Sequence, residues 1–323
     1  MTVSLKEAYF VPNRAFIPAQ RSLFKSADAP PDTFLATPGE PPGLIPRPLQ
    51  GPLVRPYYDN VADAKLQESY YQSLELSANG QEAFDQLSKL VKDTHTTQLN
   101  YAPEKYVYPW VELRPNGQIE SIYSPDSVVK ITPAKTAAVD AAMAQMASFA
   151  PLAPETVAAH MTLTQVAGSL NCEHVVPQSW YDAKEPMRGD LHHLFACDSR
   201  CNSFRGNRAY HESTGASTDT VARCGVRTDE DKGFQPMAGH GAVARATLYF
   251  LLRYPKKASA YGADDIATLV KWSQKEPPSL YEKHRNAAIQ ELQGNRNPFI
   301  DHPEWVSKVD FGPGVRKRPV QEE

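Results

Sequence analysis

Asn171-Cys-Glu-His-Val-Val-Pro-Gln-Ser-Trp180 opens the most informative part of this 323-residue chain. Two blocks follow it closely, Gly189-Asp-Leu-His-His-Leu-Phe195 and Cys201-Asn-Ser-Phe-Arg-Gly-Asn207. Together they contain a carboxylate, Glu173, an imidazole, His174, and an amide, Asn202. Hard divalent cations such as Mg²⁺ take oxygen ligands, which Glu173 and Asn202 supply. The pattern predicts a metal site beside a histidine whose ordinary pKa suits proton transfer near neutrality.

The local order around this site is predicted to be strand, loop, strand, helix. Residues 163–176 and 191–197 have the pattern of two short strands. Asp198 or Ser199 then caps a helix that runs through Asn202, because their side-chain oxygens accept free backbone N–H groups. Adjacent strand residues point to opposite faces, so Glu173 and His174 share one site only if the strand ends or bulges there.

Residues 171–210 resemble the core of the bacterial endonuclease I family, which belongs to the ββα-metal (His-Me finger) nucleases. The likeness continues through residues 234–236, 241–249 and 296–305, and upstream through Tyr70-Tyr71 and residues 87–101. It covers about residues 58–306. A Glu-His pair alone would be a weak signal, whereas separate blocks in the family's order are specific.

The resemblance implies a metal-dependent endonuclease with little sequence specificity, which hydrolyses phosphodiester bonds and leaves 5′-phosphate ends. His174 would be the general base, and Glu173 and Asn202 would bind one Mg²⁺, or Mn²⁺ or Ca²⁺ at the same site. DNA is the expected substrate, and RNA stays open as a second one. The alternative is a non-catalytic nucleic-acid or protein interaction module with a zinc-stapled ββα core. The sequence carries no signal that identifies an inhibitor or immunity protein as a partner.

Further residues are predicted to assist at the site. Arg205, one turn after Asn202, has a guanidinium suited to holding a phosphate. By strand alternation, one of His192 and His193 faces the site; we favour His193 as a support or phosphate contact, with a purely structural role as the alternative. The weaker candidates for phosphate binding are Arg188, Arg208 and Arg245.

All four cysteines surround the same blocks: Cys172, Cys197, Cys201 and Cys224. They would form two disulfides in an oxidising compartment, a four-thiolate zinc site, or four reduced thiols. Cys197 and Cys201 are four apart at the strand-to-helix junction, which is awkward for a direct disulfide but suits two thiolates on one ion. The zinc site is favoured because no secretory signal indicates an oxidising destination, and reduced compartments disfavour disulfides.

Composition is that of a soluble globular protein, with 41% hydrophobic and 22% charged residues. The net charge of −3 counts against a passive nucleic-acid binder, which usually carries a strongly basic face. No apolar run reaches the length of a membrane span. The first ten residues lack the basic start and apolar stretch of a secretory signal, which predicts a cytoplasmic protein or export by another route.

The predicted fold class is α+β, with helices surrounding the ββα core, which occupies about residues 163–208. Residues 1–57 are proline-rich and predict an extended arm, residues 58–306 form the catalytic domain, and residues 307–323 form a basic tail. A β-hairpin is predicted from residues 106–113 and 118–123, which flank the turn signal Pro115-Asn-Gly117. Helices are expected at residues 64–76, 80–94, 137–149, 242–254, 264–274 and 280–292.

Overall fold

The computed structural model describes residues 56–124, 128–129, 170–213, 219–221, 223–228, 233–258 and 260–315. The proline-rich arm up to residue 55, the helix expected at 137–149 and the end of the tail lie outside these residues. So does the first half of the strand expected at 163–176. Among the described residues, no helix combines the length and apolar character that a bilayer crossing requires.

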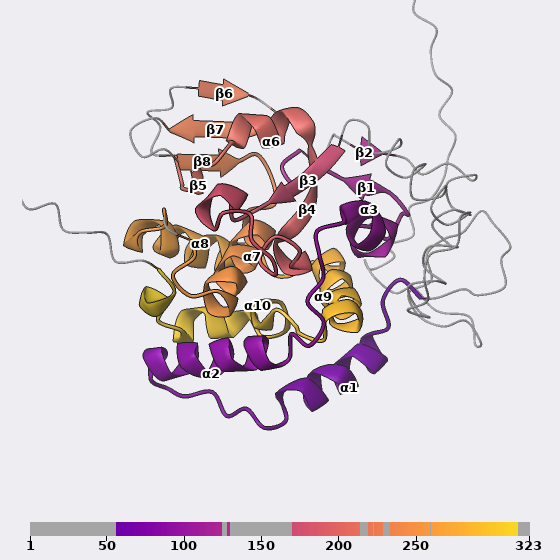
Figure 1. Ribbon diagram of the computed structural model, residues 1–323, viewed down its shortest axis with the longest axis vertical. Coiled ribbons are helices and arrows are strands. Elements are labelled where there is room, and N and C mark those ends of the chain that lie inside the picture. Colours follow the sequence, from indigo (N-terminus) through magenta and orange to yellow (C-terminus); the bar gives the residue numbers. More distant parts are fainter. Residues whose placement is uncertain are drawn as a thin grey trace, which may run out of the picture. The chain divides into compact units, whose positions relative to one another are not determined.

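Five helices of 12 to 14 residues lie below the strands in the view of Figure 1. They are α1 (Asn60–Tyr71), α2 (Gly80–Asp93), α7 (His240–Arg253), α8 (Ala263–Lys275) and α9 (Leu280–Gln293). The shorter ones are α3 (Pro103–Tyr106), α6 (Ser199–Arg205) and α10 (Pro298–Asp301). Five of the six expected helices are therefore present, and α1 begins about one turn early because the Asp59 side chain caps it.

Caps set the ends of these helices. The Asn79 side chain accepts hydrogen bonds from the first backbone N–H groups of α2, whose buried Phe84, Leu87 and Val91 follow the helical period. Ser279 and Glu282 form a capping box at the start of α9. That helix ends at Gly294, whose φ of 91° is left-handed and therefore suits glycine.

The strands form three small sheets: β1 (Ile119–Glu120) with β2 (Val128–Val129), β3 (Leu170–His174) with β4 (Leu194–Asp198), and a four-stranded sheet. The four-stranded sheet has the order β5 (Ala209–Tyr210), β8 (Gly233–Pro236), β7 (Gly225–Thr228), β6 (Asp219–Val221). Only its β5–β8 pair is parallel. The mixture of helices and small sheets confirms the α+β class.

Strand β4 lies between two clusters of buried apolar side chains. Phe195 and Cys197 belong to the larger cluster, which α2, α7 and α8 build, and Leu194 and Ala196 belong to the smaller one. This two-residue alternation is the pleat of a strand buried on both faces. Helix α6 follows β4 directly and packs against β3 and β4 (Figure 1).

The expected hairpin is only half right. Residues 107–111 form a π-helical turn, Val107–Val111, rather than a strand. All five of its side chains are buried, so its sequence carries no contrast between an inward and an outward face. The turn itself forms where Pro115-Asn-Gly117 predicted it, with Leu113 and Ile119 bridged across it.

Candidate active site

Strand β3 ends at the two residues that the sequence singled out. Glu173 lies opposite Phe195 and His174 opposite Leu194 in the antiparallel β3–β4 pair, and the strand stops at His174. Glu173, His174 and Asn202 line one polar cavity of about 140 Å³. The structure therefore brings the three principal predicted residues together, and the strand end lets neighbouring side chains share the cavity.

Glu173 is a buried carboxylate, with 2% of its surface exposed. The Tyr123 hydroxyl donates to its Oε1 atom at 2.6 Å, and the Arg205 guanidinium pairs with the same atom. Burial raises the pKa of Glu173, and the Arg205 charge opposes that rise. A cation in the cavity would favour the charged carboxylate further.

Asn202, the fourth residue of α6, lines the same cavity as Glu173. Asp198 caps this helix by accepting from the N–H groups of Arg200 and Cys201. The Nδ2 atom of Asn202 donates to the Asn171 side chain at 2.9 Å. An amide has one oxygen and one NH₂ group, so this bond turns the carbonyl oxygen of Asn202 away from Asn171. That oxygen is the donor atom a hard cation needs.

His174 is held at both ring nitrogens and is 5% exposed. Its Nε2 atom lies 3.0 Å from the carbonyl oxygen of Arg188, and its Nδ1 atom lies 3.2 Å from the amide nitrogen of Gln178. Burial lowers the pKa of His174 to about 3, with a smaller contribution from His193. The imidazole is therefore neutral near pH 7 and able to accept a proton.

The predicted role of His193 depends on a strand that starts at residue 191, and this predicted start is wrong. Leu191–His193 is a 3-10 turn, and β4 begins only at Leu194. His193 is fully buried, with its Nε2 atom 2.6 Å from the Met187 carbonyl oxygen and its ring edge-on to that of His174 at 5.3 Å. It packs against the His174 ring and does not line the cavity, which supports the structural alternative.

Arg205 does not present a free guanidinium as the sequence suggested. It is 1% exposed and pairs with Glu173. Its remaining N–H groups donate to the carbonyl oxygens of His174 at 2.9 Å, Val175 at 2.7 Å and Arg208 at 3.0 Å. These contacts fix the backbone where β3 ends, and Arg205 lines the cavity with these N–H groups already donating to protein acceptors.

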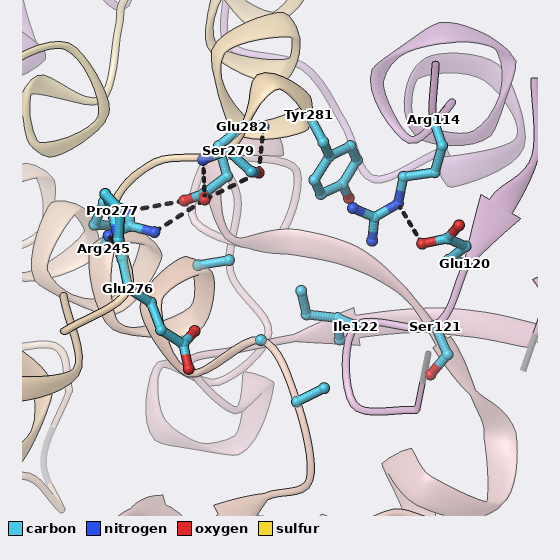
Figure 2. A pocket seen from close by; sticks show the side chains of 13 residues that line it. Arg114, Glu120, Ser121, Ile122, Arg245, Glu276, Pro277, Ser279, Tyr281 and Glu282 are labelled. Atoms are coloured by element: carbon cyan, nitrogen blue, oxygen red, sulfur yellow. Dashed lines mark hydrogen bonds and ion pairs between the residues drawn. The ribbon is translucent and has the colours of Figure 1, made fainter. Parts of the chain in front are cut away.

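Arg245 is also engaged elsewhere, in a bidentate pair with Glu282 at 2.7 and 2.9 Å. It lines a second, larger cavity of about 260 Å³ (Figure 2). There Arg114 pairs with Glu120 and lies over the Tyr281 ring, so the cavity's cations face their own carboxylates. Arg245 thus lies outside the cavity that Glu173, His174 and Asn202 line, and its guanidinium is paired with Glu282.

Arg188 is the arginine beside His174. Its Nε atom donates to the Gln178 side chain at 3.0 Å, and its guanidinium lies over the Tyr101 ring at 4.6 Å. It is half-buried. Arg208 contributes its carbonyl oxygen to Arg205.

The cysteines follow neither of the two bonded arrangements considered. Cys201 and Cys224 form a disulfide, whereas Cys172 and Cys197 are free thiols. The four-thiolate zinc site is therefore wrong, and so is the pair of disulfides. Within the described part of the chain, no cluster of three or more His, Cys, Asp or Glu side chains is arranged to hold a metal. The Glu173–Asn202 pair, one carboxylate and one amide, is a different kind of donor set.

Two site residues were missed by the sequence reasoning. Gln178 stands four residues after His174, inside the first quoted block, and that proximity was a usable signal. Tyr123, which holds Glu173, is 50 residues away along the chain and offered no local pattern.

The Endonuclease I family profile matches residues 80–304. The chain belongs to the Endonuclease I family. It is 33% identical over 159 residues to an extracellular ribonuclease of Bacillus amyloliquefaciens, a match that covers 44% of this chain and 54% of that protein.

Two further relatives come from Aeromonas hydrophila. The chain is 30% identical over 156 residues to an extracellular deoxyribonuclease, covering 42% of this chain and 66% of the relative. It is 29% identical over 156 residues to a periplasmic deoxyribonuclease, covering 42% and 64%. The matches thus span about half to two thirds of these Endonuclease I relatives.

Proposed function

We propose that this protein is a metal-dependent endonuclease that hydrolyses phosphodiester bonds and has a ββα-metal core formed by β3, β4 and α6. The observation that carries the proposal is the meeting of Glu173, His174 and Asn202 in one polar cavity. Glu173 and His174 come from the end of β3 and Asn202 from α6, in the order strand, strand, helix that the family resemblance implies.

Glu173 and Asn202 fit a single hard cation. They offer a carboxylate and an amide oxygen to the same small cavity, and Mg²⁺ typically takes one or two carboxylates and keeps several waters and substrate oxygens. Mn²⁺ or Ca²⁺ would use the same donors. When bound, the ion would supply positive charge to the scissile phosphate and to the oxygen that leaves.

His174 is the proposed general base. Its neutral imidazole accepts the proton of the attacking water, while the Arg188 carbonyl oxygen holds the Nε2–H group and steadies the charged ring that results. Burial that lowers the pKa of His174 to about 3 makes it a weak base in the free protein. A bound phosphate raises that pKa by its negative charge, so substrate binding strengthens the base.

Arg188 is the proposed phosphate contact. The family resemblance implies an arginine near the product phosphate. Arg188 lies beside His174, where its Nε–H group donates to the Gln178 side chain. Stacking on Tyr101 limits the freedom of its guanidinium, which lowers the entropy lost on binding. This role replaces the one first expected of Arg205.

DNA is the proposed main substrate, with RNA as a second one, because the relatives bear both deoxyribonuclease and ribonuclease names. The relatives are named as extracellular or periplasmic, and a Cys201–Cys224 disulfide fits an oxidising compartment. We therefore propose export. Alkylation and mass spectrometry of protein recovered from its native host would show this bond; two reduced thiols at these positions would contradict it.

The test is nicking of supercoiled plasmid by purified protein with Mg²⁺, with and without chelator. Wild-type protein should nick, chelator should abolish nicking, and His174→Ala should slow it by about 10²–10⁴-fold. His302→Ala, at a half-exposed histidine stacked on Trp305, is the matched control. Products should accept ligation without added phosphate at the 5′ end. Metal-independent binding of DNA without cleavage would favour the interaction-module alternative.

A further inference from the structure

Gln178 lies between His174, the proposed general base, and Arg188, the proposed phosphate contact. Its Nε2 atom is 3.2 Å from His174 Nδ1, and its Oε1 atom accepts from Arg188 Nε at 3.0 Å. The third contact, from His174 Nε2 to the Arg188 carbonyl oxygen at 3.0 Å, closes a ring of three residues.

The donor and acceptor atoms fix the direction of each hydrogen bond in this ring of three residues. The Nε–H group of Arg188 can only donate, so the Gln178 atom that faces it is the oxygen. The other end of the amide is then the NH₂ group, which only donates, so His174 Nδ1 must carry a lone pair. The Arg188 carbonyl can only accept, so the proton of the imidazole is on Nε2. Both contacts of the ring specify the same tautomer.

The imidazole is also held in place by its neighbours. The Tyr101 ring lies 5.0 Å from it and the His193 ring 5.3 Å, measured between ring centroids. Gln178 instead belongs to a single 3-10 turn, Gln178–Trp180, at the edge of the cavity that it and His174 line. The amide can therefore move more readily than the imidazole.

We propose that Gln178 is a positioning residue that keeps Nδ1 of His174 as the unprotonated atom and couples the base to Arg188. This inference rests on the proposed function. The contact to Nδ1 is at the long end of the hydrogen-bond range, so an entering water replaces the amide there. A phosphate that binds Arg188 also moves the Nε–H group that donates to the Gln178 oxygen. Substrate binding is thereby linked to release of the lone pair on His174 Nδ1.

Two substitutions separate the two contacts. Gln178→Glu keeps an oxygen for Arg188 but turns a second acceptor towards Nδ1, which places a proton on that atom. Gln178→Met keeps the side-chain length and removes both hydrogen bonds, while the Arg188 carbonyl still holds the Nε2 proton. Gln274→Glu and Gln274→Met, at an exposed position of α8, are the matched controls.

The readouts are kcat and KM for plasmid nicking, and nitrogen-15 NMR of the histidine rings in substrate-free protein. The glutamate variant should lose at least about 100-fold in kcat, with Nδ1 of His174 protonated in the spectrum. The methionine variant should keep kcat within about tenfold and raise KM about 5- to 10-fold, because Arg188 loses its partner.

A glutamate variant with wild-type kcat, or with Nδ1 still unprotonated, would overturn the inference. So would equal losses of kcat in both variants, which would indicate packing alone. If the glutamate variant does not fold, the methionine variant decides, since an unchanged KM rules out the coupling to Arg188. Failure of the proposed function is distinct: wild-type protein would then cleave no better than His174→Ala, while the NMR spectrum would still report the tautomer.

Discussion

Arg205→Met is expected to destabilise the protein before it affects phosphate binding. The guanidinium is buried, pairs with Glu173 and donates to the carbonyl oxygens of residues 174, 175 and 208. Methionine fills much of the volume but supplies none of these donors. The substitution leaves a buried carboxylate without its cation and three carbonyl groups without this donor.

The magnitude follows from the lost pair. Removing one partner of a buried ion pair costs about 3–5 kcal/mol. Each carbonyl left unsatisfied would add about 1–3 kcal/mol, but water from the adjoining cavity offsets part of that. We expect the free energy of unfolding to fall by about 4 kcal/mol. The double variant Glu173→Gln, Arg205→Met should recover part of the loss, since the uncompensated charge is removed.

Urea unfolding followed by tryptophan fluorescence measures the change. Arg200→Met on the same helix is the matched control, because that side chain is 76% exposed and should change stability by no more than about 0.5 kcal/mol. The reasoning is refuted if Arg205→Met unfolds within about 1 kcal/mol of wild type while KM for nucleic acid rises sharply. That result would restore Arg205 as a phosphate ligand.

Three other changes have definite expected outcomes. Replacing Cys201 and Cys224 by serine should lower the free energy of unfolding by about 3 kcal/mol for a separation of 23 residues, and equal urea midpoints would contradict this. Burial lowers the pKa of His192 to about 4, so the unfolded chain binds this proton first as pH falls below about 6.5, and stability drops. His192→Gln should reduce the slope of stability against pH by about 1.4 kcal/mol per unit between pH 6 and 4; an unchanged slope would count against it. Asn202→Ala should weaken Mg²⁺ binding in calorimetry and regain part of its activity at high Mg²⁺, whereas unaltered affinity would remove this residue from the donor set.

The sequence predicted the elements whose signals are local. Helices α2 and α9 have side-chain caps, and the four helices α2, α7, α8 and α9 were expected within two residues of their observed ends. The meeting of Glu173, His174 and Asn202 was also expected, because a family pattern preserves the spacing that places them. The alternation of side chains required the strand to end or bulge at Glu173 and His174, and the strand ends at His174.

What the sequence could not supply depends on contacts between distant segments. Val107–Val111 is buried on every side, so its composition is equally suited to a strand. The disulfide between Cys201 and Cys224 depends on how β7 approaches α6, and no rule of cysteine spacing predicts that approach. The same limit applies to Arg205, since an arginine near a catalytic motif looks like a ligand until its buried acceptors are known.

The junction between β4 and α6 has a consequence for the substrate. Strand β4 ends at Asp198 and α6 begins at Ser199, so no loop separates the helix that carries Asn202 from the strand that pairs with β3. Asp198 caps the helix and pairs with Arg223, and the disulfide holds the same helix one residue before Asn202. A helix held in this way is expected to shift little when a ligand binds. In the proposed nuclease a misfitting duplex would have to deform instead, so cutting preferences should follow the local stiffness of the duplex rather than the identity of its bases.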